Sequence, residues 1–548
     1  MSLLGLPTEL LDDIILQVYN NGDLKSIAQS CKRIYQLSKP HLEQDHIFRR
    51  QWRHVAVSEK QSIFSVLAAI AREPVIARFV RDLDLRSADE SADERTRRVR
   101  FEPQNGGYVK YGEDAEFVRT LVRSLPQLTL AKHDASDWIV MIMPLRVAVR
   151  RARDQDFPTS RDMVMHRIVL LLTLLPNLER LRLPKFWART EAGEPETWKE
   201  VLSVMVNVAN DRRDILGPEG HSEAPLARLG QLLPSQETDE DGRCRAGLKE
   251  VAPLFLLPGL EQVHIMKYMA HSNDNMYSGI SFDWSGSPRV SLGDAMSNVR
   301  SLHFEACCID AANIGRILER MSALTSLRYS HHATWNGAGH NWNAGAFAAA
   351  VSAHCGSQLT QLSLTVRHRM GAIEGGIVSL HELTALKEVQ LDLQMFAAPP
   401  SASDFRSRFG GLSLAADAES NINGILPLSQ ILPIGMERVS LVMHAGHGIE
   451  HGQSELDIVR KQLRTLKALF AADLTISHRC LQQLILRHDG QAIDLGMHTI
   501  VGQSGKRSDV SLESQVARLL RGTGVVGVLI DDSHDAFESM PWENGDEY

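Results

Sequence analysis

Residues 359–364, LTQLSL, show the pattern that decides the fold: a leucine, two other residues, a leucine, one residue and a leucine. The alternation of apolar and polar residues at its end has the period of a β-strand. Seven further segments repeat the pattern with other apolar or aromatic residues at the same places: 178–183 (LERLRL), 260–265 (LEQVHI), 299–304 (VRSLHF), 324–329 (LTSLRY), 386–391 (LKEVQL), 436–441 (MERVSL) and 481–486 (LQQLIL). Eight copies in one chain predict a repeat architecture.

Helical stretches separate the copies, for example at residues 198–210, 309–321 and 457–472. A strand with its return helix buries its apolar face only against neighbouring units, which is the organisation of a solenoid. The pattern resembles leucine-rich repeats, but its spacing varies from about 25 residues to over 50, whereas regular copies have roughly 20–29. The asparagine that usually follows the strand is also missing. The resemblance implies an α/β fold, an irregular horseshoe with insertions.

Residues 6–42, LPTELLDDIILQVYNNGDLKSIAQSCKRIYQLSKPHL, predict three short amphipathic helices. Pro7 suits the first position of a helix, because its missing N–H costs nothing there. The stretch 20–22, Asn-Asn-Gly, is expected to end the first helix and Asp23 to cap the second, while the third is expected to run to Pro40. Three such helices are too few to close a good core alone. They are expected to cap the following repeats or to bind a partner.

Eight positions of this segment match the F-box in residue type and order: Leu6, Pro7, Leu10, Leu11, Ile14, Leu24, Ile27 and Cys31. The segment is therefore similar to an F-box, a motif that docks on a Skp-type adaptor and, through it, on a cullin. The resemblance implies that these residues bind the adaptor or form the core of the motif, and residue type does not separate the two. Residues 54–57, 63–71 and 80–85 resemble the junction by which fungal F-box proteins join the motif directly to their first repeats.

The composition is that of an ordinary globular chain, with 43% hydrophobic and 23% charged residues. A net charge of −8 argues against general nucleic-acid binding, which favours a strongly basic face. Six cysteines are scattered without paired CxxC spacing, as expected of a reduced intracellular protein. No apolar run approaches the roughly 18 residues of a membrane span, and the start lacks a basic region. We expect a cytoplasmic or nuclear protein with no membrane partner.

The domain organisation follows from these patterns. We expect an F-box at residues 1–45 and an irregular leucine-rich-repeat domain at 46–530. Two polar inserts, near 86–113 and 211–247, are predicted to be flexible surface loops because they contain little apolar material. An acidic tail without lysine or arginine occupies residues 531–548 and is expected to be disordered or loosely docked.

Motifs that suggest chemistry are weak in this chain. Residues 522–527 fit GxGxxG, but a helix precedes them and a strand follows, the reverse of a dinucleotide site. Residues 444–451, HAGHGIEH, contain three histidines and a glutamate that suit a metal, although the glycines favour an exposed loop. No serine, histidine and acid arrangement stands out. We therefore expect no catalytic residue, cofactor or metal.

Two further groups are candidates for partner contact. The first is a predicted loop after the strand at 324–329 that carries histidine and tryptophan: His331, His332, Trp335, His340 and Trp342. The second is a pair of basic clusters, at residues 95–100 and at Arg146, Arg150, Arg151 and Arg153. These clusters suit an acidic or phosphate-bearing target, but a solvated surface is the favoured interpretation.

If the chain is a horseshoe, the residues between the core positions of each strand face its inner surface. They form a candidate partner-binding strip: Arg182, His264, His303, Arg328, Ser363, Gln390, Ser440 and Ile485, flanked by Glu305, Asp392 and Arg487. The sequence thus predicts a substrate-recognition subunit of an SCF-type ubiquitin ligase, without an active site of its own. Two alternatives are a repeat scaffold not linked to ubiquitin and a metal-dependent enzyme that uses residues 444–451.

Overall fold

The computed structural model describes residues 6–16, 21–58, 61–87, 113–143, 160–184, 187, 197–216, 224–234, 246–271, 282–284, 292, 296–332, 334–335, 338–339, 342–368, 373, 375–396, 425–444, 462, 464–471, 478, 480–489, 500–501, 507–508 and 527–531. The chain forms two compact units. The first unit comprises residues 1–185 and 200–230, and the second comprises residues 186–199 and 231–548. Within the described residues, no helix combines the length and the apolar character needed to cross a membrane.

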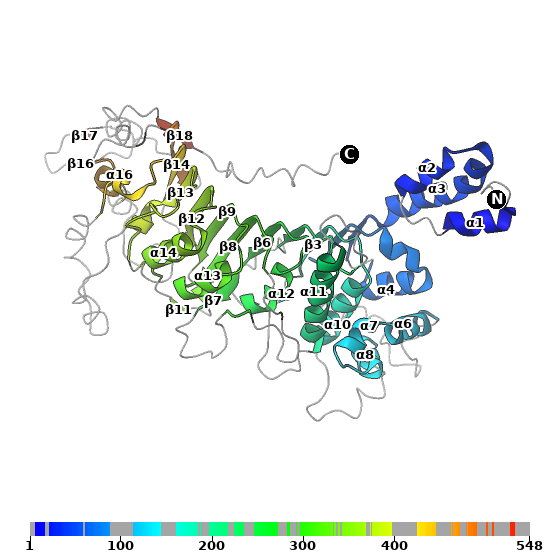
Figure 1. Ribbon diagram of the computed structural model, residues 1–548. Coiled ribbons are helices and arrows are strands. Elements are labelled where there is room, and N and C mark those ends of the chain that lie inside the picture. The colour runs from blue at the N-terminus through cyan, green and yellow to red at the C-terminus, as the bar shows by residue number, and fades with distance from the viewer. Residues whose placement is uncertain are drawn as a thin grey trace, which may run out of the picture. The chain divides into compact units, whose positions relative to one another are not determined.

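Three helices open the first unit, as the sequence predicts: α1 (Thr8–Leu16), α2 (Asn21–Ala28) and α3 (Lys32–Trp52) (Figure 1). Helices α1 and α2 both pack against α3. A small apolar core lies between them, formed by Ile15, Leu24 and Ile34 with the half-buried Ile27 and Leu37 at its edge. Burial of one face of each helix, more than helix propensity, stabilises such short segments.

The boundaries of these helices differ from the prediction in two places. Asn21 and Gly22 lie at the start of α2 instead of ending the first helix. Helix α3 continues to Trp52, past Pro40, where the sequence predicted its end. A proline inside a helix removes one N–H donor and leaves a carbonyl unpaired. That carbonyl belongs to Gln36, four residues earlier, and both Gln36 and Pro40 are exposed, so water can hydrate it and the helix continues.

The first unit also contains three parallel strands in the order β1 (His54–Ala56), β2 (Asp82–Asp84) and β3 (Arg180–Arg182). Their central residues, Val55, Leu83 and Leu181, are in register and buried. The helices of this unit are α4 (Ile63–Arg72), the 3-10 helix η2 (Pro74–Arg78), α6 (Asp114–Arg123), α7 (Pro126–Leu130), α8 (Ala135–Ile142), α10 (Ser160–Thr173) and most of α11 (Thr197–Leu216). Helix α10 is buried on every side over residues 163–172, as expected of a core helix.

A row of parallel strands forms the second unit: β4 (Gln231–Leu233), β6 (Gln262–Met266), β8 (Ser301–Ile309), β9 (Ser326–His332), β12 (Gln361–His368), β13 (Glu388–Asp392), β14 (Arg438–His444), β15 (Gln483–Asp489) and β18 (Gly527–Asp531). Its helical elements are η3 (Leu248–Glu250), α12 (Ala252–Phe255), α13 (Ala311–Leu318), α14 (Ala344–Cys355), η4 (Leu393–Phe396) and α16 (Leu428–Ile431). Helices α12, α13 and α14 lie along one side of the strands (Figure 1). The fold is α/β, as predicted.

Short strand pairs complete the second unit. Strand β5 (Ala246–Gly247) pairs with β7 (Tyr268–Ala270), which continues the pairing to β8. Two antiparallel pairs stand apart from the row: β10 (Thr334–Trp335) with β11 (Ala338–Gly339), and β16 (Ile500–Val501) with β17 (Arg507–Ser508).

Every copy of the repeated pattern contains a strand, which confirms the strand prediction for β3, β6, β8, β9, β12, β13, β14 and β15. The central apolar residue of each copy in the second unit is in register with the next: Val263, Leu302, Leu327, Leu362, Val389, Val439 and Leu484. All of them are buried. Because a shift by one residue would turn every side chain to the other face, burial of this line fixes the register.

The predicted loop at 211–247 contains ordered structure. Helix α11 reaches Leu216, and β4 lies at Gln231–Leu233. Leu226, Leu229 and Leu232 are fully buried. These few apolar residues stabilise the segment, although the range as a whole is polar. Most of the predicted insert near 86–113, and the acidic tail beyond Asp531, lie outside the described residues.

Candidate functional site

The helices α1 to α3 present large apolar side chains to solvent. Leu10 and Ile14 of α1 are 49% and 40% exposed, and Tyr35 of α3 is 50% exposed. Leu10 and Ile14 are four residues apart and therefore lie on one face of α1. Leu11 and Ile15, each one position further along, are buried. Helix α1 thus has an inner apolar face that closes the core and an outer apolar face that the described residues leave exposed.

The structure divides the eight F-box-like residues by exposure. Leu11 and Leu24 are buried, whereas Pro7, Leu10 and Ile14 are exposed; the half-buried members are Leu6, Ile27 and Cys31. This division separates core residues from those open to a partner, which residue type alone did not achieve.

Two polar contacts hold the start of α1 to α3. The Nη2 atom of Arg33 donates hydrogen bonds to the carbonyl oxygen of Leu6 and to Oγ1 of Thr8, each at 3.1 Å. Cys31 is the residue before α3, and its Sγ accepts a hydrogen bond from the backbone N–H of Ile34 at 3.5 Å. Cys31 therefore caps α3, so its place in the motif has a local structural reason.

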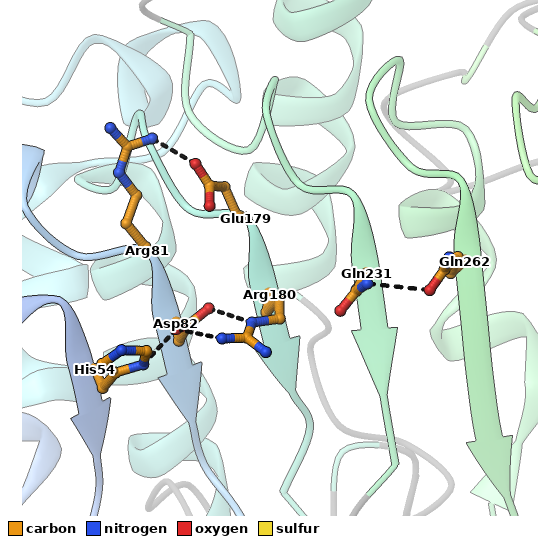
Figure 2. Close-up of polar contacts among 7 residues, drawn as sticks. All are labelled: His54, Arg81, Asp82, Glu179, Arg180, Gln231 and Gln262. Atoms are coloured by element: carbon orange, nitrogen blue, oxygen red, sulfur yellow. Dashed lines mark hydrogen bonds and ion pairs between the residues drawn. The ribbon is translucent and has the colours of Figure 1, made fainter. Parts of the chain in front are cut away.

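Polar side chains cross-link the three strands of the first unit (Figure 2). Asp82 of β2 accepts two hydrogen bonds from Arg180 of β3, at 2.6 and 2.8 Å, and pairs with His54 of β1 on its other side. His54, Asp82 and Arg180 occupy one level of the register. Arg81 donates to Glu179 at 2.6 Å beside them. These partly exposed pairs tie neighbouring strands together, and each contributes little stability individually.

The predicted strip forms one register level in the second unit. His264, His303, Arg328, Ser363, Gln390, Ser440 and Ile485 are matched in turn across neighbouring strands. Arg182, its remaining member, lies on β3 of the first unit in register with Asp84. Two residues before this level, Gln231 donates a hydrogen bond to Gln262 at 3.0 Å (Figure 2).

Part of the strip is not available to a partner. Ser363, Gln390 and Ser440 are buried, at 7%, 5% and 2% exposed, and the Ser363 hydroxyl donates to Gln390 Oε1 at 3.1 Å. The expected exposure is wrong for these three, because both faces of β12, β13 and β14 are covered at this level. The members of the second unit that stay half-buried are His264, His303, Arg328 and Ile485.

A cluster of polar side chains lies where the strip crosses β6 and β8. The imidazole rings of His264 and His303 stack with their centroids 4.0 Å apart and their planes 15° apart. His264 Nε2 is 3.0 Å from Glu305 Oε2, and Arg367 of β12 pairs with the other carboxylate oxygen, Oε1. We call His264, His303 and Glu305 the His–Glu cluster. One donor atom from each lies within 4.8 Å of the others.

The surroundings determine the charges of this cluster. Burial, with the charges of His264 and Arg328, lowers the pKa of His303 well below its usual value, so its ring is neutral at neutral pH. Burial by itself raises the pKa of Glu305, but the hydrogen bond and charge of His264 and the contacts of Arg367 outweigh it and lower the pKa. Glu305 is therefore an ionised carboxylate. In the sequence, Glu305 only flanks the strip and Arg367 carries no signal, because only the register brings the two side chains together.

The prediction of a loop with histidine and tryptophan side chains available to a partner is wrong for three of its members. His331 and His332 belong to β9, and both are buried together with Trp342. His331 lies on the same face of β9 as Leu327 and Tyr329, so the strand turns it into the core. Its ring stacks on Trp342 at 4.3 Å, and its Nδ1 is 2.8 Å from the hydroxyl of Tyr329. These residues fill the core and cannot contact a partner.

Several other candidates lie largely outside the described residues. Of residues 444–451, only His444 is described, at the end of β14. The basic clusters at 95–100 and at Arg146, Arg150, Arg151 and Arg153 lie outside, as does His340. The GxGxxG stretch is described only at Gly527, the first residue of β18, which confirms the predicted strand after it.

Function is therefore inferred from two features of the described residues. One is the exposed apolar face of α1, and the other is the polar face of β6, β8 and β9, which carries His264, His303 and Arg328. Comparison of the chain with models of protein families and with curated proteins finds no match in either set.

Proposed function

We propose that this protein is the substrate-recognition subunit of an SCF-type ubiquitin ligase. Helices α1 to α3 form its F-box and bind a Skp-type adaptor that connects the chain to a cullin. The parallel strands and their helices form an irregular leucine-rich-repeat horseshoe that binds a protein target through the polar face of β6, β8 and β9, where His264, His303 and Arg328 stay half-buried. The observation that carries this proposal is the exposure of Leu10 and Ile14 on a helix whose neighbouring residues, Leu11 and Ile15, are buried.

The exposed face of α1 is large enough to matter for binding. Full burial of a leucine or isoleucine side chain contributes about 1.5–3 kcal/mol, so covering these half-exposed residues contributes roughly 1 kcal/mol each. Tyr35 of α3 adds an aromatic side chain of the kind enriched at interfaces. An isolated exposed leucine is ordinary, whereas two on one helical face of an F-box-like unit indicate a docking surface.

The mechanism requires no catalytic group in this chain. One part of the protein holds the adaptor and another holds the target, so the target stays near the ubiquitin carrier of the ligase. Tethering raises the effective concentration of the two reactants without any new chemical contact. The proposed location is the cytoplasm or the nucleus, where cullin-based ligases act.

Capture of a Skp-type adaptor by the full-length protein tests this proposal. The double variant Leu10→Ser/Ile14→Ser is expected to lose capture, because it removes the exposed apolar face and leaves the buried core intact. A matched control is Leu130→Ser, which changes a leucine that is 58% exposed at the end of α7 in the same unit. The control is expected to capture the adaptor as the unchanged protein does.

Two results would contradict the ligase proposal: failure of the unchanged protein to capture the adaptor, or full capture by the double variant. Far-UV circular dichroism of each protein shows whether a loss of capture comes from unfolding. A protein that binds targets without the adaptor would instead be a repeat scaffold unconnected to ubiquitin.

A further inference from the structure

The His–Glu cluster places three potential metal ligands on two neighbouring strands. His264 and His303 are register partners on β6 and β8, and Glu305 follows His303 by two residues, so all three side chains lie on one face. Strands hold such groups more rigidly than loops. The three residues are half-buried, so the cluster is not closed off from solvent. A ladder of paired strands thus brings together groups that are 41 positions apart in the chain.

We infer that the His–Glu cluster binds a divalent transition-metal ion of the zinc type. Two imidazoles and one carboxylate are a ligand set that zinc uses, with bonds of about 2.0–2.2 Å and a fourth position open to water or to a partner's side chain. Magnesium and calcium favour all-oxygen sites instead. This inference does not depend on adaptor binding, because it concerns only side chains of β6 and β8 in the second unit.

The donor atoms of the His–Glu cluster are close enough for this ligand set once their side chains rotate. Tetrahedral zinc with such bonds places its ligand atoms about 3.3 Å apart. His264 Nε2 and Glu305 Oε2 are already 3.0 Å apart, and His303 supplies an atom within 4.8 Å of both. Metal binding also requires the stacked rings of His264 and His303 to turn, because an imidazole coordinates in its ring plane and parallel rings do not direct their nitrogens to one point. Among the described residues, His303 makes a ring contact with His264 but no hydrogen bond through its ring nitrogens.

Two arginines lie beside this site: Arg367, which pairs with Glu305, and Arg328, the register partner of His303. Arg367 pairs with Oε1 of Glu305 and leaves Oε2 on the side of the histidines. A polar partner on a ligand carboxylate orients it, as outer groups do in metal sites. The guanidinium charges also repel a cation, so we expect binding weaker than that of a structural zinc site with four protein ligands.

Zinc titration of the metal-free full-length protein tests the inference. Isothermal calorimetry is expected to show saturable uptake by this cluster, and the melting temperature is expected to rise with zinc, because an ion that binds only the folded state stabilises it. Loss of a group that supports a metal ligand weakens metal affinity about 10–100-fold. His303→Ala and Glu305→Gln each remove a ligand, so each is expected to weaken zinc binding by more than that. Magnesium and calcium are expected to leave the melting temperature unchanged.

Two control variants identify the source of the zinc uptake. His54→Ala removes a histidine that pairs with a single carboxylate, Asp82, and is expected to leave uptake unchanged. His447→Ala/His451→Ala removes the other histidine-rich stretch of the chain and is expected to leave the uptake of the His–Glu cluster in place.

The absence of saturable zinc uptake in the unchanged protein would overturn the inference. So would uptake that persists in both His303→Ala and Glu305→Gln and disappears in His447→Ala/His451→Ala. Glu305→Gln keeps the size of the side chain and guards against a result that reflects unfolding. Because no adaptor is present, the outcome does not depend on whether the protein joins a ubiquitin ligase.

Discussion

At the scale of the residue, neighbours in the sequence have opposite environments. Leu10 and Leu11 are adjacent leucines in α1, yet one is half-exposed and the other is buried. An α-helix turns by about 100° per residue, so a single step moves a side chain from one face to another. Both leucines match the F-box pattern, and only their packing tells the surface residue from the core residue.

Leu11→Ala is expected to destabilise the first unit by about 2–5 kcal/mol, because it removes buried apolar atoms and leaves a cavity. Leu10→Ala, the matched control, is expected to change the free energy of unfolding by only about 0.5 kcal/mol. Urea denaturation of both variants measures the difference. Equal effects of the two substitutions would contradict the assignment of Leu11 to the core.

Cys355, at the end of α14, is expected to resist alkylation over the neutral and mildly basic range. Burial raises the pKa of its thiol to about 12, so the reactive thiolate is scarce until the pH approaches that value. Cys480 is exposed and serves as the internal comparison. Mass spectrometry after brief treatment with iodoacetamide at pH 8 reports both. Equal modification of the two cysteines would show that α14 opens readily.

At the scale of the element, the repeated pattern predicted the strands, and the helices expected at 198–210 and 309–321 correspond to α11 and α13. A strand needs only a few alternating residues, and burial of Leu302, Leu327 and Leu362 aligns their strands. Helix α3 passes Pro40 because an exposed proline is tolerated where tertiary contacts hold the remaining helix. The signal that a proline gives is local, whereas the stability of a helix depends on what it packs against.

Ser363 of β12 and Gln390 of β13 form a buried hydrogen bond that joins two strands. Ser363→Ala is expected to destabilise the second unit by about 1–3 kcal/mol, because Gln390 Oε1 then lacks its partner in the core. The double variant Ser363→Ala/Gln390→Leu is expected to recover much of that loss. Urea denaturation of the single variants and the double variant gives the coupling energy. Purely additive effects would exclude this contact as a source of stability.

At the scale of the whole molecule, the proposed adaptor surface and the proposed target surface belong to different units. The exposed residues of α1 lie in the first unit, and the polar face of β6, β8 and β9 lies in the second. Substitutions in separate cores and surfaces without shared contacts usually act independently. The two binding activities are therefore expected to be separable by substitution.

Affinity purification from cells with the proteasome blocked tests this separation. Leu10→Ser/Ile14→Ser is expected to lose the adaptor and the cullin while retaining the proteins that bind the second unit. The unchanged protein provides the reference set of partners. If the variant loses all partners together while its circular dichroism spectrum is unchanged, the two surfaces are not independent.

The sequence by itself determined the α/β class, the places of the repeated strands and the three helices of residues 6–42. These features follow from the periodic spacing of apolar residues that are only a few positions apart in the sequence. Only the tertiary structure decided which polar residues stay accessible, which is why Ser363 and His331 proved to be buried. It also decided that His264 and Glu305 meet. The register of strands and the covering of a sheet depend on contacts between segments that are distant in the sequence. A local pattern of apolar residues does not predict such contacts.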